Sequence, residues 1–344
     1  MSTPPLPPAQ LHDMPDAEFI DWCYRRILMR PVDDSGRQHY LAALAGGLSR
    51  LDLIRELFEC SEYRDRFAAC RLYPPGHALS PLPSAAEIEA HAHFNWHPPD
   101  IPGIDLRIDE QRQLLSRLAA HYPRLPFTEQ PVAGRRFSYA NSSYTHADAI
   151  LLGCLMIELR PRRIIEVGSG HSSAAMLDVN DACLDGQVEF TFIDPDPSRL
   201  HALIDASAVR AQIVPTTLQQ VPAETFAALQ SGDILFIDSS HVSKLGSDVN
   251  RVFFEILPSL ADGVYVHIHD VLYPFEYLLQ WLQRGMVWNE QYLLRAFLQY
   301  NHRFAIRLFS TLMLDTDRAW FAQHMPDVHK EHGGCLWMEK VPPH

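Results

Sequence analysis

Residues 164–173 have the sequence IIEVGSGHSS, which is the most informative stretch of this chain for predicting its fold. The apolar run that ends at Val167 predicts a buried strand, and the small-residue turn Gly168-Ser169-Gly170 leads into a predicted helix start. Glycines let the backbone pass close to a ligand, and the first N–H groups of a helix are free to bind one. The stretch therefore predicts a strand, a ligand-binding turn and a helix.

The chain around this stretch alternates strands with helices. We expect helices at 106–122 and 148–159, and strands at 163–167, 189–194, 212–214, 233–238, 263–269, 303–309 and 335–339. This rhythm predicts an α/β fold with a doubly wound, Rossmann-like and mainly parallel sheet. Ligands of such sheets bind beyond the carboxyl ends of the strands, and the motifs described below fall at such ends.

The N-terminal part of the chain has a helical pattern instead. Ser49 is a predicted N-cap, and apolar residues recur at helical spacing from Phe19 to Leu28: Phe19, Ile20, Cys23, Ile27 and Leu28. Prolines then crowd between Leu72 and Pro102, which blocks regular structure. We expect a small α-helical domain at 1–71, a Pro-rich linker at 72–104 and the α/β domain at 105–344.

Composition and charge narrow the classes of function. A hydrophobic fraction of 47% supports a packed core over most of the 344 residues. The formal net charge of −13 repels phosphate backbones, so we expect a neutral or cationic acceptor and no nucleic acid. The six cysteines form no CxxC pair and are expected to be free thiols. The N-terminal residues have no signal-peptide pattern, and we find no apolar run of about 18 residues, which predicts a cytoplasmic protein without a transmembrane segment.

Acidic side chains around the glycine turn indicate which cofactor it binds. Glu166 precedes the turn, where a methyltransferase places a carboxylate near the methionine moiety, and a dinucleotide-binding turn would have a third glycine where Ser172 stands. Asp194 ends the next strand and could bind the ribose hydroxyls, with Asp196 as a rival and an Asx turn as the alternative for either. We predict that S-adenosylmethionine binds to Glu166, Gly168, Ser169, Gly170, Ser172, Asp194, Gln220 and Asp238.

Four titratable residues follow the fourth and fifth strands. Asp238 and His241 come from the segment DILFIDSSH, and His269 and Asp270 from VHIHD. Carboxylates are the ligands that Mg²⁺ prefers, so we predict a divalent-cation site at Asp238, His269 and Asp270. His241 is then free to accept a hydroxyl proton as the catalytic base. The alternatives are helix caps for the carboxylates and a non-ligand role for His269, because an imidazole favours Mn²⁺ or Fe²⁺ over Mg²⁺.

These motifs resemble a known family. PRRIIEVGSGHSS, DILFIDSSH, VHIHD, LYPFEY and WNEQYLLRAFLQYN are similar to the class I methyltransferases labelled methyltransferase domain 24, over about residues 135–340. The resemblance implies a seven-stranded sheet with an antiparallel last strand. Metal-dependent sugar O-methyltransferases of this group have an Asp-x-x-His motif, matched by Asp238 and His241, and an acidic pair, from which His269 departs. The N-terminal segment 15–70 resembles DUF4214, a small domain attached to enzymes of surface-polysaccharide assembly.

Aromatic and polar residues after the fifth strand suit a sugar or polyketide acceptor. Our acceptor-site candidates are Tyr273, Glu276, Trp288 and Asn289, while the rest of 288–300 reads as an amphipathic helix. Tyr139, Asn141, Tyr144 and Asp148 could close over the cofactor. We therefore expect an S-adenosylmethionine-dependent O-methyltransferase, assisted by Mg²⁺ or Mn²⁺, that acts on a small molecule or glycan. Its further partners would be a second copy of the chain, in a homo-oligomer, or proteins of polysaccharide assembly. The alternatives are a scaffold protein of polysaccharide assembly and an NAD-linked oxidoreductase.

Overall fold

The computed structural model describes residues 14–68, 73–91, 98–204 and 210–343. The chain divides into two compact units, Met1–His93 and Phe94–His344, which are described separately. The predicted boundary between residues 71 and 72 lies outside the described residues, as does Cys70. The division into domains at 1–71, 72–104 and 105–344 therefore stays a prediction.

The first unit is helical, as predicted. It contains α2 (Asp16–Cys23), which continues into the π-helical turn η1 (Tyr24–Leu28), then α3 (Asp34–Ala45), α4 (Arg50–Glu59), α5 (Ser61–Arg66) and α7 (Ala85–His91). Ser49 caps α4, because its side chain accepts a hydrogen bond from the backbone N–H of Asp52. The predicted apolar positions from Phe19 to Leu28 are all buried in one cluster. Asp33 caps α3, because its side chain accepts a hydrogen bond from the backbone N–H of Gly36.

The second unit is built on a seven-stranded sheet. Its strands are β1 (Arg163–Val167), β2 (Glu189–Ile193), β3 (Ala211–Val214), β4 (Ile234–Ile237), β5 (Tyr265–His269), β6 (Phe304–Phe309) and β7 (Cys335–Lys340). Their order in the sheet is β3-β2-β1-β4-β5-β7-β6. The first five strands are parallel, and β7 lies antiparallel between β5 and β6. The predicted strands and the antiparallel last strand are confirmed.

Helices connect the strands of this unit. Before the sheet come α8 (Ile108–Leu118), η2 (Tyr122–Arg124) and α9 (His146–Leu159). Between β1 and β5 lie α10 (His171–Cys183), α11 (Ser198–Leu203), η3 (Leu218–Gln220), α12 (Ala223–Ala227), α13 (Asp248–Arg251), η4 (Val252–Ile256) and α14 (Leu257–Ser259). Then follow α15 (Leu279–Gln283), α16 (Glu290–Leu298), α17 (Ser310–Thr316), α18 (Arg318–His324) and η5 (Pro326–His329).

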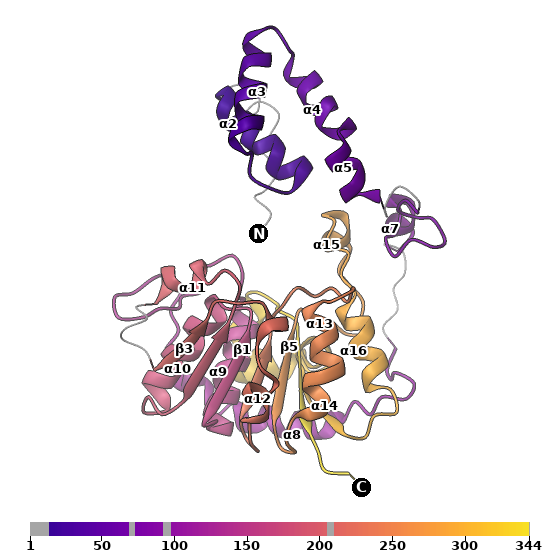
Figure 1. Ribbon diagram of the computed structural model, residues 1–344. Helices are drawn as coiled ribbons and strands as arrows, with labels where there is room; N and C mark the ends of the chain where they lie inside the picture. The colour runs from indigo at the N-terminus through magenta and orange to yellow at the C-terminus, as the bar shows by residue number, and fades with distance from the viewer. Residues whose placement is uncertain (1–13, 69–72, 92–97, 205–209, 344) are drawn as a thin grey trace. The chain divides into compact units, whose positions relative to one another are not determined.

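Two apolar cores cover the two faces of the sheet. Successive side chains of a strand point to opposite faces, so Ile164 packs with α8, α9 and α10, whereas Ile165 and Val167 pack with α12, η4 and α16. The helices lie in layers against the strands (Figure 1). The alternation also sends the Glu166 side chain to the α10 face, which explains where this carboxylate finds its partners.

The described residues bear on two further predictions from the sequence. No helix in the described ranges is both long and apolar enough to cross a membrane. The cysteines that the structure describes, Cys23, Cys60, Cys154, Cys183 and Cys335, are free thiols, as expected.

Candidate active site

The turn after β1 is held together by the Glu166 carboxylate. Glu166 is 0% exposed, and its two oxygens accept hydrogen bonds from the hydroxyls of Ser172, at 2.5 Å, and Ser173. Burial raises the pKa of Glu166 to about 8, although both serine hydroxyls favour the charged form. Glu166 therefore ties the end of β1 to the first turn of α10, and its predicted contact with the cofactor stays a prediction.

Gly168 lets two strand ends approach each other. Its φ is +85°, and a Cβ built at this position would overlap the backbone carbonyl oxygen of Asp238. The Asp238 N–H also donates to the carbonyl of Val167 at 2.8 Å. Any other residue at 168 would push the turn away from the end of β4, so this glycine is required by the packing.

A cavity of about 470 Å³ opens beyond the ends of β1, β2 and β4. Gly168, Asp194 and Asp238 line it, together with Leu218 and Gln219 after β3. Gln220, the predicted adenine contact, is not among its lining residues and accepts a hydrogen bond from the Thr216 hydroxyl instead. The cavity lies at the strand ends where we predict the cofactor from the sequence. Gln219 lines it in place of the predicted Gln220.

Asp194 forms an Asx turn and also lines the cavity in which the ribose is expected. Its Oδ1 accepts from the backbone N–H of Asp196 at 2.8 Å, which is an Asx turn, and its Oδ2 accepts from the Ser169 N–H at 2.9 Å. The carboxylate also faces the cavity, while Asp196 is exposed and does not line it. The structure thus ties Asp194 to the Ser169 turn, and binding of ribose stays a prediction.

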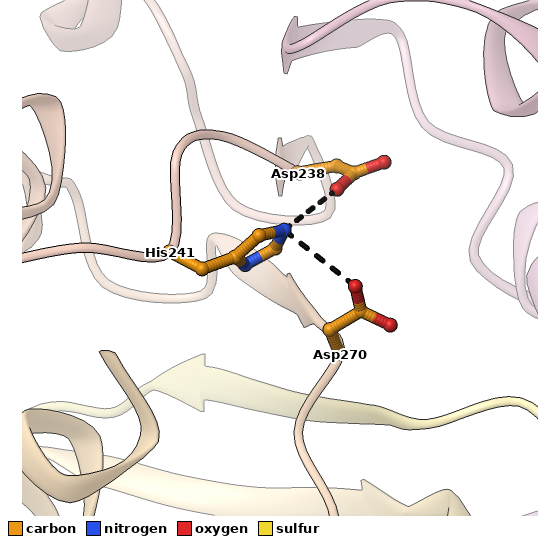
Figure 2. A group of neighbouring side chains, drawn as sticks. All are labelled: Asp238, His241 and Asp270. Carbon is orange, nitrogen blue, oxygen red and sulfur yellow. Dashed lines mark ion pairs between the residues drawn. The ribbon is translucent and has the colours of Figure 1, made fainter. Parts of the chain in front are cut away.

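Three side chains converge after β4 and β5. Nε2 of His241 lies 3.3 Å from Oδ1 of Asp238 and 3.6 Å from Oδ2 of Asp270 (Figure 2). One donor atom from each residue lies within 4.8 Å of the others, a spacing that could hold a metal ion. Both His241 and Asp270 have a positive φ, of 58° and 55°, an uncommon conformation that aims their side chains at one point.

A third carboxylate orients His241 from the other side. Oε2 of Glu290, which is 2% exposed, lies 2.9 Å from Nδ1 of His241. The backbone N–H groups of Asn289 and Glu290, at the start of α16, both donate to the carbonyl of His241. A histidine with one nitrogen fixed by a carboxylate presents the other nitrogen in a defined direction, as catalytic bases and metal ligands both require.

The carboxylates around His241 favour the positively charged form of its imidazole. Burial disfavours the imidazolium of His241, but Asp238 and Glu290 outweigh burial and raise the pKa of His241 well above its ordinary value. Burial raises the pKa values of Asp270 and Glu290, and histidine charges oppose the change. The carboxylates therefore favour the protonated form of His241.

His269 lies beside this cluster and not in it. Its Nε2 is 3.8 Å from Oδ1 of Asp270, its Nδ1 is 3.3 Å from Nε2 of His267, and its ring stacks on Tyr144. The structure therefore brings His241, and not His269, together with Asp238 and Asp270. A metal contact by His269 stays a prediction.

A second cavity, also of about 470 Å³, lies on the other side of the cluster. Asp270, Tyr273 and Trp288 line it with Trp281 and Tyr144. Of the predicted acceptor residues, Tyr273 and Trp288 face this cavity. Glu276 and Asn289 are not among its lining residues: Glu276 accepts from the Tyr292 hydroxyl, and the Asn289 side chain bonds the backbone of Ser243.

The residues upstream of β1 also have a different setting from the one expected. Asn141, Tyr144 and Asp148 line the second cavity and not the cavity beside Gly168, and Tyr139 stacks on His146.

Glu290 was not predicted from the sequence. Its only signal is a carboxylate at the start of an amphipathic helix pattern, and 49 residues separate it from the histidine that it orients.

Comparisons with known proteins agree with this picture. Residues 165–271 match a family model described as a methyltransferase domain, and residues 9–67 match DUF4214, a domain of unknown function, so both resemblances are confirmed. An uncharacterized protein of Archaeoglobus fulgidus is 27% identical over 169 residues, which are 48% of this chain and 76% of that protein.

Two solved structures are loosely similar to the chain. One is the S-adenosylhomocysteine-bound methyltransferase PaMTH1 of Podospora anserina, 14% identical, covering 75% of this chain and 95% of that one with a TM-score of 0.39. The other is the O-methyltransferase TomG of Streptomyces achromogenes with bound S-adenosylmethionine, 15% identical, covering 74% and 96% with a TM-score of 0.36.

Proposed function

We propose that the protein is an S-adenosylmethionine-dependent methyltransferase that methylates a hydroxyl of a sugar, a glycan or a glycosylated natural product, with help from a divalent cation. The match of residues 165–271 to a methyltransferase domain supports this proposal. One observation carries the proposal. Asp238 lines the cofactor cavity, Asp270 lines the second cavity, and His241 lies between the two carboxylates. Two substrates can therefore be held on either side of one acid–base cluster.

His241 is the proposed base. The methyl carbon leaves the sulfonium and bonds to the acceptor oxygen, S-adenosylhomocysteine departs, and the hydroxyl proton moves to Nε2 of His241, which must be neutral before the transfer although the neighbouring carboxylates raise its pKa. Glu290 holds Nδ1, so the ring needs no reorientation during the transfer. Trp288, whose ring centroid lies 4.5 Å from that of His241, covers one side of the base and limits access of water.

The cluster also fits a divalent cation. Asp238 and Asp270 offer carboxylate oxygens within 4.8 Å of each other, and these would hold the ion, with His269 beside them. Nε2 of His241, whose Nδ1 is held by Glu290, would stay free to accept the proton. Such an ion would supply the positive charge that the imidazole otherwise carries as a proton, and it would lower the pKa of a neighbouring hydroxyl.

The lining of the second cavity supports a neutral, hydroxylated acceptor. Tyr273, Trp281 and Trp288 offer rings that stack on the faces of a sugar. Asn141 and Thr145 add amide and hydroxyl groups, and no Lys or Arg is present among the described residues that line this cavity. A phosphorylated or otherwise anionic acceptor would therefore find no Lys or Arg side chain among these lining residues.

Titration calorimetry of the full chain with S-adenosylhomocysteine tests the proposal. After chelation of divalent ions, the protein should bind S-adenosylhomocysteine with micromolar affinity, and it should bind Mn²⁺ in a separate titration that Asp238→Ala weakens at least tenfold. Asp262→Asn, at the other end of β5 from Asp270, removes the same charge and should leave both affinities unchanged. Failure to bind S-adenosylhomocysteine would favour a scaffold protein of polysaccharide assembly, and Mn²⁺ binding equal in parent and Asp238→Ala would refute the cation site.

A further inference from the structure

We propose that Asp148 and Tyr144 form a polar subsite of the second cavity that binds a hydrogen-bond donor of the acceptor, either a hydroxyl or an ammonium group, distinct from the hydroxyl that is methylated. This inference rests on the proposed function and makes it more specific. The acceptor would be a neutral or cationic molecule with at least two polar groups, and not a simple alcohol.

Asp148 carries an unused acceptor at the cavity wall. The residue is 3% exposed, and its Oδ1 has no hydrogen-bond partner among the described residues. A buried carboxylate oxygen without a donor is costly, so its presence in a cavity wall indicates a missing ligand. The second oxygen, Oδ2, accepts from the Thr145 hydroxyl at 2.8 Å, which fixes the rotamer of the carboxylate.

The cap of α9 uses only one of the two carboxylate oxygens of Asp148. Thr145 is the N-cap of α9, and its hydroxyl accepts from the backbone N–H of Asp148 as well as donating to Oδ2. Oδ1 takes no part in the cap. A residue selected only for capping would leave this oxygen in contact with water at the surface, whereas here it is buried beside the cavity.

The lack of a side chain at Gly333 leaves the space that the Asp148 carboxylate occupies. A Cβ built at Gly333 would overlap all three atoms of the Asp148 carboxylate group. Gly333 itself lines the same cavity, so the loop before β7 and the first turn of α9 meet at this carboxylate. A larger residue at position 333 would push the Asp148 side chain out of its place in the cavity wall, while the carboxylate group itself would be unchanged.

Tyr144 supplies the second unused group. Its ring, 3% exposed, stacks on His269 with centroids 5.4 Å apart, and its hydroxyl has no hydrogen-bond partner in the described ranges. The stacking places the tyrosine next to the cluster that performs the transfer. A polyol bound between Asp148 and Asp270 could thus use one hydroxyl for recognition and present another to His241.

The charge around the subsite selects the kind of donor. The cavity is lined by the carboxylates of Asp148, Asp270, Asp315 and Glu331 and by the imidazoles of His269 and His332, so its acidic groups outnumber its basic groups. A further anion would be repelled, because like charges at close range in a partly buried site disfavour binding. A hydroxyl or an ammonium group satisfies both the hydrogen bonding and the charge.

Three methyl glycosides that share one ring can test the subsite. The full chain, saturated with S-adenosylhomocysteine and Mg²⁺, is titrated by saturation-transfer NMR with methyl glucoside, methyl glucosaminide and methyl glucuronide, which are neutral, cationic and anionic. We expect binding of the neutral or the cationic probe and at least tenfold weaker binding of the anionic one. Comparison of the first two probes distinguishes a hydroxyl from an ammonium donor.

Variants then locate the binding. Asp148→Asn and Gly333→Ala should each weaken the preferred glycoside at least tenfold, and Tyr144→Phe about threefold, while S-adenosylhomocysteine binds normally. Asp262→Asn should change neither affinity. Glycoside binding unaltered in Asp148→Asn, or a parent protein that binds S-adenosylhomocysteine but neither the neutral nor the cationic probe, would overturn the subsite alone. Loss of S-adenosylhomocysteine binding by the parent would overturn the proposed function as well.

Discussion

At the scale of single residues, His241 is restrained at three places. Its Nδ1 faces Glu290, its Nε2 faces Asp238 and Asp270, and its carbonyl accepts two N–H groups from the start of α16. The positive φ of the residue costs free energy that a surface loop would not retain without a purpose. The imidazole is therefore positioned by its neighbours more than by its own loop.

Replacement of His241 by Ala should separate chemistry from binding. We expect S-adenosylhomocysteine affinity within about threefold of the parent and turnover at least 100-fold lower, since general base catalysis contributes roughly 10²–10⁴ in rate. Turnover is measured as release of S-adenosylhomocysteine from S-adenosylmethionine with an accepted glycoside. His302→Ala, an exposed histidine on the loop before β6, serves as the control and should behave as the parent. Equal rates in His241→Ala and the parent would eliminate His241 as the base.

Glu166 should make stability depend on pH. Its pKa is about 8 in the folded chain against an ordinary value of 4.5, so the folded state binds the proton more tightly. The stabilisation is complete below pH 4.5 and is lost as pH rises through 8, with a slope of at most about 1.4 kcal/mol per pH unit. Glu166→Gln should flatten the decline between pH 5 and pH 8 in denaturant melts.

The control for this effect is a carboxylate on the next strand. Glu189, at the start of β2, is about half exposed and pairs with Arg163 and Arg210. Glu189→Gln should leave the slope of stability against pH as it is in the parent. A parent protein whose stability is flat across this range would show that Glu166 is charged when folded.

At the scale of elements, the site depends on how two strand ends meet. The turn between β1 and α10 crosses the end of β4 at Gly168, where the backbone of Asp238 occupies the space of a side chain. The same contact fixes the start of the loop that carries His241. The turn after β1 and the loop that carries His241 are therefore packed directly against each other.

Gly168→Ala should damage both stability and cofactor binding. A methyl group there meets backbone atoms and a φ of +85°, so we expect a loss above 2 kcal/mol, measured by denaturant unfolding, and at least tenfold weaker S-adenosylhomocysteine binding. Gly232→Ala is a matched control, because Gly232 has a φ of +86° but open space around it. It should cost only about 1 kcal/mol and leave the affinity unchanged. Similar losses in the two variants would deny a special role to the contact with Asp238.

The sequence predicted elements better than it predicted contacts between them. The strands were predicted correctly because buried parallel strands are rich in apolar residues, as in the continuous apolar run of β4. Gln220 was predicted as a cofactor contact, but the sequence does not show the 3-10 turn η3, in which Gln219 and not Gln220 lines the cavity. Glu290 was missed since its contact with His241 depends on how α16 packs against the β4 loop, and no local pattern encodes that packing.

At the scale of the whole molecule, the chain consists of two units with separate cores. Differential scanning calorimetry of the full chain should therefore show two transitions. S-adenosylhomocysteine at about 100 times its dissociation constant adds roughly 2.7 kcal/mol to the unit that binds it, so only the transition of the second unit should move to higher temperature. One transition that shifts as a whole would mean that the two units unfold together.

The arrangement of the two cavities has a consequence for the kinetics. The cofactor cavity and the second cavity reach the same cluster from opposite sides, through Asp238 and Asp270, so both substrates can be present when the methyl group moves. Transfer then occurs in one displacement, without a methylated enzyme as an intermediate. Initial-rate plots should intersect, as for a ternary complex, and a chiral methyl group should reach the acceptor with its configuration inverted.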